Sequence, residues 1–283
     1  MASEKTIAIE HLYDTVFLLQ GRSTVRLTDV VDSILFCNKH FGTGLSTKNP
    51  ANFFKDFIRG ENSSANWPKR LTTARMTARQ LTGNSFAFEF IPFAKDQTEA
   101  FPERFPPSPE VVTIPIQTVT LNLAARELGR RDEPWLVQTI VNLRIVEQFL
   151  AVMSDIPFIE ISHLQMSVKL SKAEIDSVFL GKYQAENGEM KYVYITCEAK
   201  QAKDRILHDQ LIRQVESAFS VNPEIESVIP IAVKALRDRG IHIVEFQKLE
   251  RETFFRDMGE LELVMQKDAI FELFPSIKGI DIH

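Results

Sequence analysis

The chain has 283 residues, 44% of them hydrophobic and 25% charged, and a formal net charge of −5. This size and composition predict a soluble protein of one large or two ordinary domains. No apolar run is long enough to span a membrane, and the N-terminus has no basic region before an apolar core, so we expect neither membrane insertion nor a signal peptide. The two cysteines, Cys37 and Cys197, lie far apart in sequence and predict no disulfide, which is typical of a cytoplasmic protein.

Positive charge is unevenly distributed along this acidic chain. The segment from residue 39 to residue 79 contains eight basic residues and two acidic ones, which gives a net charge of +6 and leaves −11 for the rest of the chain. A basic segment in an acidic protein indicates contact with a polyanion, although an ordinary solvated face would have the same composition. The eight basic residues are Lys39, Lys48, Lys55, Arg59, Lys69, Arg70, Arg75 and Arg79.

Two helices and a hairpin are predicted in the N-terminal third. Residues 27–41 have apolar side chains at helical spacing behind an N-cap at Thr28 or Asp29. The Asn49-Pro50 pair favours the start of a second helix, which we expect to end at Gly60. Residues 75–93 alternate in the manner of strands around a Gly-containing turn at residues 82–85, which is typical of a β-hairpin.

This order of elements resembles a winged helix-turn-helix over about residues 24–93. The resemblance implies that the polar stripe of the second helix faces the major groove of DNA, while the basic hairpin reaches phosphates or the minor groove. The alternative is a small α+β domain with a solvated helix. The expected DNA contacts are Lys48, Asn52, Lys55 and Arg59 on the helix, with Arg75 and Arg79 on the hairpin.

A proline-rich run, FPERFPPSPEVVTIP, predicts a domain boundary, with domains at residues 1–105 and 106–283. After it, residues 133–153 predict one long amphipathic helix, and Glu147 falls on its apolar stripe. A carboxylate there needs a metal or a partner to offset its desolvation. The alternatives for Glu147 are a functional acid or a residue paired with Arg144 or solvent.

A strand, a hairpin and a helix are predicted after residue 157. The strand covers residues 158–170, the hairpin turns at Asn187-Gly188, and a helix is expected from about Asp204 to Ser220, followed by strands at 227–234 and 241–247. The hairpin brings Asp176 towards the end of its second strand. Side chains two residues apart share one face of a strand, so Glu198 and Lys200 project together there. The chain also contains Glu189-Met190-Lys191, which we interpret as solvated charge beside the turn.

The segment from Glu174 to Gln214 contains an acid, a Glu-x-Lys and a following helix, and in these features it resembles the PD-(D/E)xK nuclease superfamily. The wider resemblance covers about residues 133–247. The resemblance implies an α/β fold in which a mixed β-sheet is flanked by helices, a restriction-endonuclease-like core. Asp176 corresponds to the motif aspartate, Glu198 to the second acid and Lys200 to the lysine. One departure is that Ile175, not proline, precedes the aspartate. Further matches are the helix acid, assigned to Glu147, and a glutamine on the helix after the hairpin, assigned to Gln210 or Gln214.

The chemistry of these residues suits phosphodiester hydrolysis. Asp176 and Glu198, with the Ala199 carbonyl and waters, form an oxygen shell suited to Mg²⁺, for which Mn²⁺ can substitute. Such an ion activates a water and stabilises charge on the phosphate, while Lys200 orients that water or stabilises the same charge. The alternative is a salt-bridge set at the end of a strand, with structural roles for the two glutamines.

The combination of a DNA-reading domain and this core resembles a type II restriction endonuclease. It implies a prokaryotic enzyme that cuts double-stranded DNA at a specific sequence, and cleavage of both strands at a symmetric site favours a homodimer. One alternative is a structure-specific or repair nuclease with the same site. A second is a DNA-binding regulator whose C-terminal domain has no catalytic activity.

Overall fold

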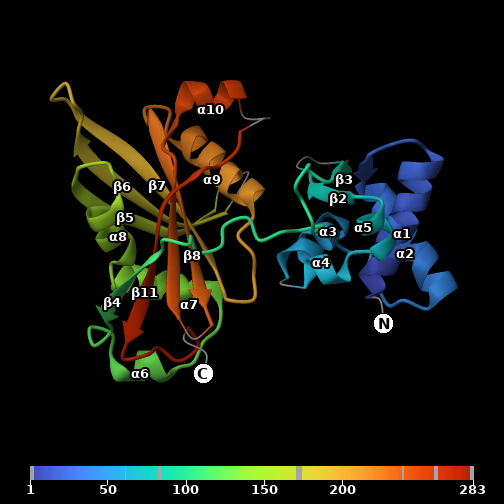
Figure 1. Cartoon of the computed structure of the whole chain (residues 1–283), viewed down its shortest axis with the longest axis horizontal. Helices are drawn as coiled ribbons and strands as arrows, with labels where there is room; N and C mark the ends of the chain where they lie inside the picture. The colour runs from blue at the N-terminus through green and yellow to red at the C-terminus, as the bar shows by residue number, and fades with distance from the viewer. Residues whose placement is uncertain are drawn as a thin grey trace. The chain divides into compact units, whose positions relative to one another are not determined.

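The computed structural model describes residues 3–60, 62–81, 85–169, 174–237, 239–257 and 261–280 (Figure 1). The chain divides into two compact units, residues 1–103 and residues 104–283. The predicted boundary after residue 105 falls two residues beyond this division. Both units combine helices and strands, and the larger one has a mixed sheet flanked by helices, as the sequence predicted at this coarse level.

The N-terminal unit packs helices against a small antiparallel sheet. Its strands lie in the order β1-β3-β2. An aromatic cluster forms the core, where the ring of Phe54 stacks on that of Phe88 with centroids 4.5 Å apart and Trp67 meets Phe54 edge to face. The elements are α1 (Glu4–Leu12), η1 (Tyr13–Leu19), β1 (Thr24–Arg26), α2 (Leu27–Phe41), α3 (Pro50–Arg59), α4 (Ser63–Asn66), α5 (Lys69–Thr73), β2 (Met76–Gln80) and β3 (Phe86–Pro92).

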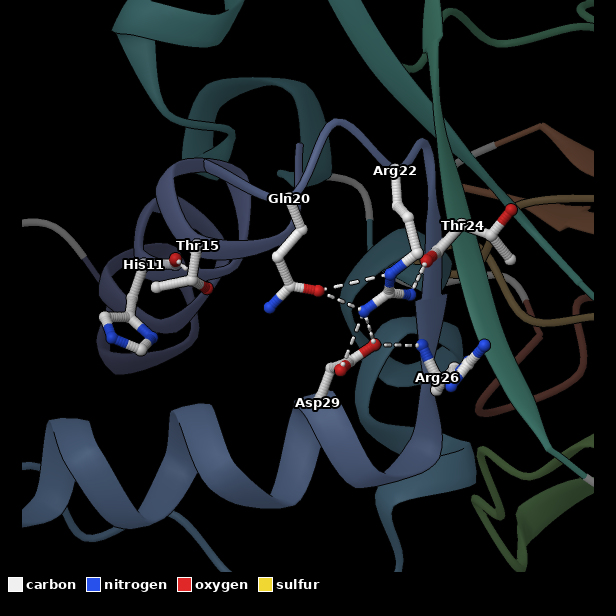
Figure 2. Close-up of polar contacts among 7 residues, drawn as sticks. All are labelled: His11, Thr15, Gln20, Arg22, Thr24, Arg26 and Asp29. Atoms are coloured by element: carbon white, nitrogen blue, oxygen red, sulfur yellow. Dashed lines mark hydrogen bonds and ion pairs between the residues drawn. The ribbon is translucent and has the colours of Figure 1, made fainter. Parts of the chain in front are cut away.

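The start of α2 is fixed by an acid inside its first turn (Figure 2). The backbone N–H of Arg26 donates to the Asp29 carboxylate at 2.7 Å, and Arg22 donates to both oxygens of that carboxylate at 3.0 Å. The predicted N-cap at Thr28 or Asp29 is therefore wrong, because Arg26 takes that position. The Asp29 carboxylate, at the third helical position, thus accepts from the N–H of the N-cap residue, as the acid of a capping box does.

Helix α3 has the predicted bounds, with Asn49 as its N-cap and Gly60 directly after its last residue. Pro50 occupies the first turn, while the side chain of Asn49 makes no capping hydrogen bond. Gly60 follows the helix with φ −74° and ψ 147°, so the chain leaves α3 in an extended conformation and not through a left-handed glycine. The next two strands form the predicted hairpin, with Met76 opposite Pro92 and Gln80 opposite Phe88. Three residues of its predicted turn, 82–84, lie outside the described residues.

The larger unit is built on a sheet that has eight strands within the described residues. Seven strands follow the order β4-β11-β9-β8-β7-β6-β5, and β10 pairs with β8. The β7–β8 and β4–β11 pairs are parallel and the remaining pairs are antiparallel. The strands are β4 (Val112–Gln117), β5 (Phe158–Lys169), β6 (Glu174–Gln184), β7 (Met190–Lys200), β8 (Ser227–Leu236), β9 (Gly240–Phe246), β10 (Leu249–Glu250) and β11 (Met265–Phe274).

Helices cover both faces of this sheet (Figure 1). Helices α7 (Glu133–Asn142) and α8 (Ile145–Met153) contribute to one apolar core, together with alternate residues of β7, β8, β9 and β11. Helices α9 (His208–Val221) and α10 (Arg251–Asp257) contribute to a second core on the opposite face. A short helix, α6 (Leu123–Glu127), precedes α7. Strand alternation explains the division, because neighbouring residues of β7 and β8 enter different cores.

The single helix predicted over residues 133–153 is wrong. Arg144 adopts a left-handed conformation, with φ 54° and ψ 40°, and the axes of α7 and α8 differ by 60°. Ile140 of the first helix and Phe149 of the second both belong to the core on one face of the sheet. Among the described helices, none alone is long and apolar enough to cross a bilayer. Only α7 and α8 taken together, as a bent pair, meet both the length and the hydropathy criteria.

Helix α9 begins at His208, four residues later than predicted. The segment between β7 and α9 forms a turn instead, in which the Asp204 N–H donates to the Gln201 carbonyl at 2.9 Å. Strand β8 contains Pro230 without a break in its pairing with β7, where Thr196 is its partner. On its other side β8 pairs with β10 up to Val228 and with β9 from Ile231. Proline therefore sits between two ladders, where the missing N–H is not needed.

Candidate acidic site at the end of strand β7

The hairpin β6–β7 places Asp176 beside the end of β7. Ser177 pairs with Cys197, and the Asp176 carboxylate accepts a hydrogen bond from the backbone N–H of Ala199 at 2.8 Å. The turn that sets this register is closed by the Gly188 N–H, which donates to the Ala185 carbonyl at 2.8 Å. The predicted meeting of Asp176 with the Glu-x-Lys residues is therefore present in the fold.

The ammonium group of Lys200 lies at the centre of the site. It contacts Oε1 of Glu198 as an ion pair, and it donates to Oε1 of Glu133 at 2.8 Å and to the Ala199 carbonyl at 3.2 Å. Lys200 is 1% exposed and Glu198 is fully buried. A buried ammonium needs close anionic partners to offset its desolvation, and the two glutamates supply them.

Helix α9 contributes one of the two predicted glutamines. The side-chain amide of Gln214 donates to Oε2 of Glu198 and, at 3.2 Å, to the Glu174 carbonyl. Gln214 is buried and connects the carboxylate to the start of β6. Gln210 is not part of this set: its Oε1 is buried with no hydrogen-bond partner within the described part of the chain.

Sequence reasoning missed Glu133, the acid that reaches Lys200 from α7. Asp132 caps this helix through a hydrogen bond from the Trp135 N–H to its carboxylate at 3.1 Å. The amide of Gln201 donates to the Asp132 carbonyl at 2.8 Å, so the start of α7 is held against the end of β7 by two neighbouring bonds. The sequence marked a helix start here, but nothing in it showed which strand end this start would meet.

The structure does not bring Glu147 to the site. Glu147 lies in the first turn of α8, and its Oε1 is 3.4 Å from Nε of Arg144. The break between α7 and α8 is the physical reason, because the register predicted for one straight helix does not continue past Arg144. The alternative of pairing with Arg144 is the one observed, and Glu133 is the helix acid that contacts Lys200.

Burial dominates the electrostatics of the site. It raises the pKa of Glu198 from 4.5 to about 8, with Lys200 opposing the shift and Asp176 and Glu133 adding to it. Burial also raises the pKa of Asp176, against the lowering effects of the Ala199 N–H, of Lys200 and of a hydrogen bond with Glu198. For Lys200, burial lowers the pKa, but the charges of Glu198 and Glu133 outweigh it and the net shift is upward.

These shifts belong to one coupled set, in which burial favours the neutral form of both acids and the Lys200 ammonium favours their ionised form. A group whose ordinary pKa is perturbed by burial and by defined charges is a candidate for function, although structural ion pairs show the same signature.

The donor chemistry of the site fits a hard divalent cation. Asp176 and Glu198 supply carboxylate oxygens and Ala199 supplies a carbonyl, the ligand types that Mg²⁺ prefers. In this structure the Lys200 ammonium supplies the positive charge beside these oxygen atoms, and it contacts both Glu198 and the Ala199 carbonyl. Among the described residues, no three His, Cys, Asp or Glu side chains are arranged closely enough to hold a metal by themselves.

The predicted DNA contacts lie in the N-terminal unit with unequal surroundings. On α3, Phe53, Phe54 and Phe57 are buried, Asn52 is exposed, and Lys55 and Arg59 are half-buried. The polar stripe therefore lies on the outer side of an amphipathic helix. Lys48 is exposed but precedes the helix, which begins at Pro50, so its predicted place on the helix is wrong.

The two hairpin arginines have partners inside the unit. Arg79 forms an ion pair with Glu89 at 3.0 Å. Arg75 donates to the carbonyls of Ala94 and Lys95 at 2.9 and 3.2 Å, and its guanidinium lies over the Phe93 ring. Contact of either arginine with a phosphate would compete with these interactions.

Comparison of the chain with protein-family models, curated proteins and solved structures finds no match.

Proposed function

We propose that this chain is a Mg²⁺-dependent endonuclease that hydrolyses phosphodiester bonds in double-stranded DNA. The observation that carries the proposal is the burial of Lys200 among the carboxylates of Glu133 and Glu198. Asp176 accepts a hydrogen bond from Ala199, the residue before this lysine. Such a set is costly to bury for stability alone, because apolar residues of similar volume would fill the space without the desolvation cost.

Each residue has a role that follows from its contacts. Asp176 and Glu198, with the Ala199 carbonyl, would hold the Mg²⁺, which supplies a more acidic water and offsets charge on the phosphate. Gln214 fixes one oxygen of Glu198 and leaves the other directed at Lys200. Glu133 positions the Lys200 ammonium, which orients the water or stabilises the charge that develops on the phosphate.

The element order of the N-terminal unit supports a winged-helix-like role in DNA recognition. Helices α2 and α3 follow β1, and the β2–β3 hairpin then completes a sheet in the order β1-β3-β2. The exposed residues Lys48 and Asn52, with Lys55 and Arg59, would face the major groove.

A recognition unit joined to such a core resembles a restriction endonuclease, which we propose acts on a specific sequence as a homodimer. In the larger unit, the order β5-β6-β7-β8 with the α9 crossover between the parallel strands β7 and β8 supports a restriction-endonuclease-like core.

The test is cleavage of plasmid DNA by the purified chain with Mg²⁺ or Mn²⁺, followed by sequencing of the fragment ends. The chain provides its own matched control, since Glu189 and Lys191 form a second Glu-x-Lys where the exposed hairpin turn meets β7. We expect discrete fragments with a common sequence at their ends, no cleavage by K200A, and full cleavage by K191A. Absence of cleavage by the wild-type chain with either metal, or cleavage by K200A at the wild-type rate, would overturn the proposal.

A further inference from the structure

Two short segments, one at the end of β7 and one at the end of the neighbouring parallel strand β8, carry net positive charge in this acidic protein. Residues 200–205, at the end of β7 and after it, contain three basic residues and one acid, or +2. Residues 234–239, at the end of β8, also contain three basic residues and one acid, or +2, while the whole chain carries −5. We call the five basic side chains around the site the basic rim: Lys203, Arg205, Lys234, Arg237 and Arg239.

The sheet register places this basic rim beside the acidic site. Lys200 of β7 pairs with Lys234 of β8 in a parallel ladder, so the two side chains lie side by side on one face. The half-buried Lys234 is thus the next side chain along the sheet from the site lysine. Arg237 and Arg239 are exposed in the turn that follows β8, and Lys203 is exposed in the segment that follows β7.

The turn that carries Arg237 and Arg239 is held against the sheet by a glycine. Leu236 pairs with Gly240, which has φ +92°, and a Cβ there would lie 2.0 Å from the Phe271 carbonyl oxygen. Only glycine permits this close approach, so the turn returns directly into β9. The two arginines therefore lie next to the ends of β8 and β9.

Three other lysines, on β6, on β7 and after β9, lie near the opposite end of the sheet. Lys182 lies over the Tyr192 ring, Lys191 forms ion pairs with Glu189 and Glu226, and Lys248 forms one with Glu250. Tyr192 and Lys200 are eight residues apart on β7, which corresponds to about 27 Å. Acids therefore pair with two of these three lysines.

We propose that the basic rim binds the phosphate backbone of the DNA strand that enters the acidic site. This inference rests on the proposed nuclease function and extends it, because it gives the larger unit a DNA-binding surface of its own. The rim reads no base sequence; it holds the backbone so that one phosphate lies at Asp176 and Glu198. The negative field of those carboxylates repels DNA, and flanking cations offset that repulsion.

The test uses the full chain, a fluorescent duplex and EDTA, with affinity measured by anisotropy at several salt concentrations. The rim variant is K203A/R237A/R239A, and the matched control is K182A/K191A/K248A, which removes the same charge at the opposite end. We expect the rim variant to bind at least about tenfold more weakly, with a salt slope shallower by up to about 2.7, or 0.9 for each phosphate that is no longer neutralised. The control should bind like the wild type.

Equal affinities and equal salt slopes for the rim variant and the control would overturn the inference. Equal thermal melts of the three proteins establish that any loss of binding is local to the removed side chains. The nuclease proposal is decided separately by cleavage with Mg²⁺. If the wild type does not cleave DNA but the rim variant binds DNA more weakly than the control, the binding surface is supported and the nuclease proposal fails. If the wild type cleaves DNA, K200A does not, and the rim variant binds like the wild type, the nuclease proposal is supported and the binding surface fails.

Discussion

The buried acid pair predicts a strong pH dependence of stability, which the Glu198→Gln substitution should remove. Burial raises the pKa of Glu198 from 4.5 in the unfolded chain to about 8 in the folded one. Between these two pH values the folded state retains a proton that the unfolded state has released. The free energy of unfolding therefore falls as the pH rises through this window, and the full loss is reached above pH 8.

The size of this effect follows from the shift. At about 1.4 kcal/mol for each pH unit between 4.5 and about 8, the loss across the window is on the order of 5 kcal/mol. Total domain stabilities are on the order of 5–15 kcal/mol, so a loss of this size is readily measured. The upward shift for Asp176 acts in the same direction. In E198Q the amide is neutral at every pH, and the contribution of this residue disappears.

Urea unfolding at pH 5 and pH 8 in EDTA measures the effect. The chain has two tryptophans, Trp67 in the N-terminal unit and Trp135 in α7, so W67F leaves Trp135 to report on the larger unit alone. We expect the wild-type background to lose several kcal/mol between the two pH values, and E198Q to lose substantially less. Parallel losses in both proteins would refute the assignment of the buried proton to Glu198.

Three further predictions concern the proposed reaction and the recognition helix. Substituting Lys200 by alanine should abolish cleavage in a single-turnover assay and leave duplex affinity within a few-fold, because its ammonium acts on the reacting phosphate; retained cutting would remove it from the mechanism. Glu133→Gln should slow cleavage on the order of 10–100-fold, because the ammonium loses its positioning partner, whereas Glu147→Gln, on the neighbouring helix, should stay within twofold. The opposite ranking of these two rates would reinstate Glu147 as the functional acid. Replacing Lys55 and Arg59 by alanine should weaken duplex binding in anisotropy titrations, and the salt slope should become shallower by about 0.9 for each phosphate that these side chains neutralise; unchanged affinity would assign this side of α3 to solvent.

Local signals in the sequence were sufficient for the hairpin that carries most of the site. An Asn-Gly turn between two alternating segments set the register, and side chains two residues apart had to share a face. The meeting of Asp176 with Glu198 and Lys200 followed from these two facts alone. Gln214 was also within reach of sequence reasoning, although helical spacing could not separate it from Gln210.

Features that depend on tertiary packing were not visible in the sequence. Arg144 adopts a left-handed conformation that usually favours glycine. Because the residue there is arginine, no signal in the sequence indicated the break between α7 and α8. Glu133 and Lys200 are 67 positions apart, and their contact depends on how α7 crosses the sheet. Strand β4 begins within the proline-rich run, and Pro115 is tolerated there because this strand is at the edge of the sheet.

The exposed turn between β6 and β7 divides the site into two halves along the chain. Residues 186–190 are solvent-exposed, with Glu133 and Asp176 before them and Glu198 and Lys200 after them. A polypeptide opened at Gly188 would give two pieces, neither of which has a complete set of charged groups. Reassembly along the eight paired positions of the β6–β7 ladder would restore that set. The fold thus offers a natural point at which to make a split protein whose activity reports on the association of its fragments.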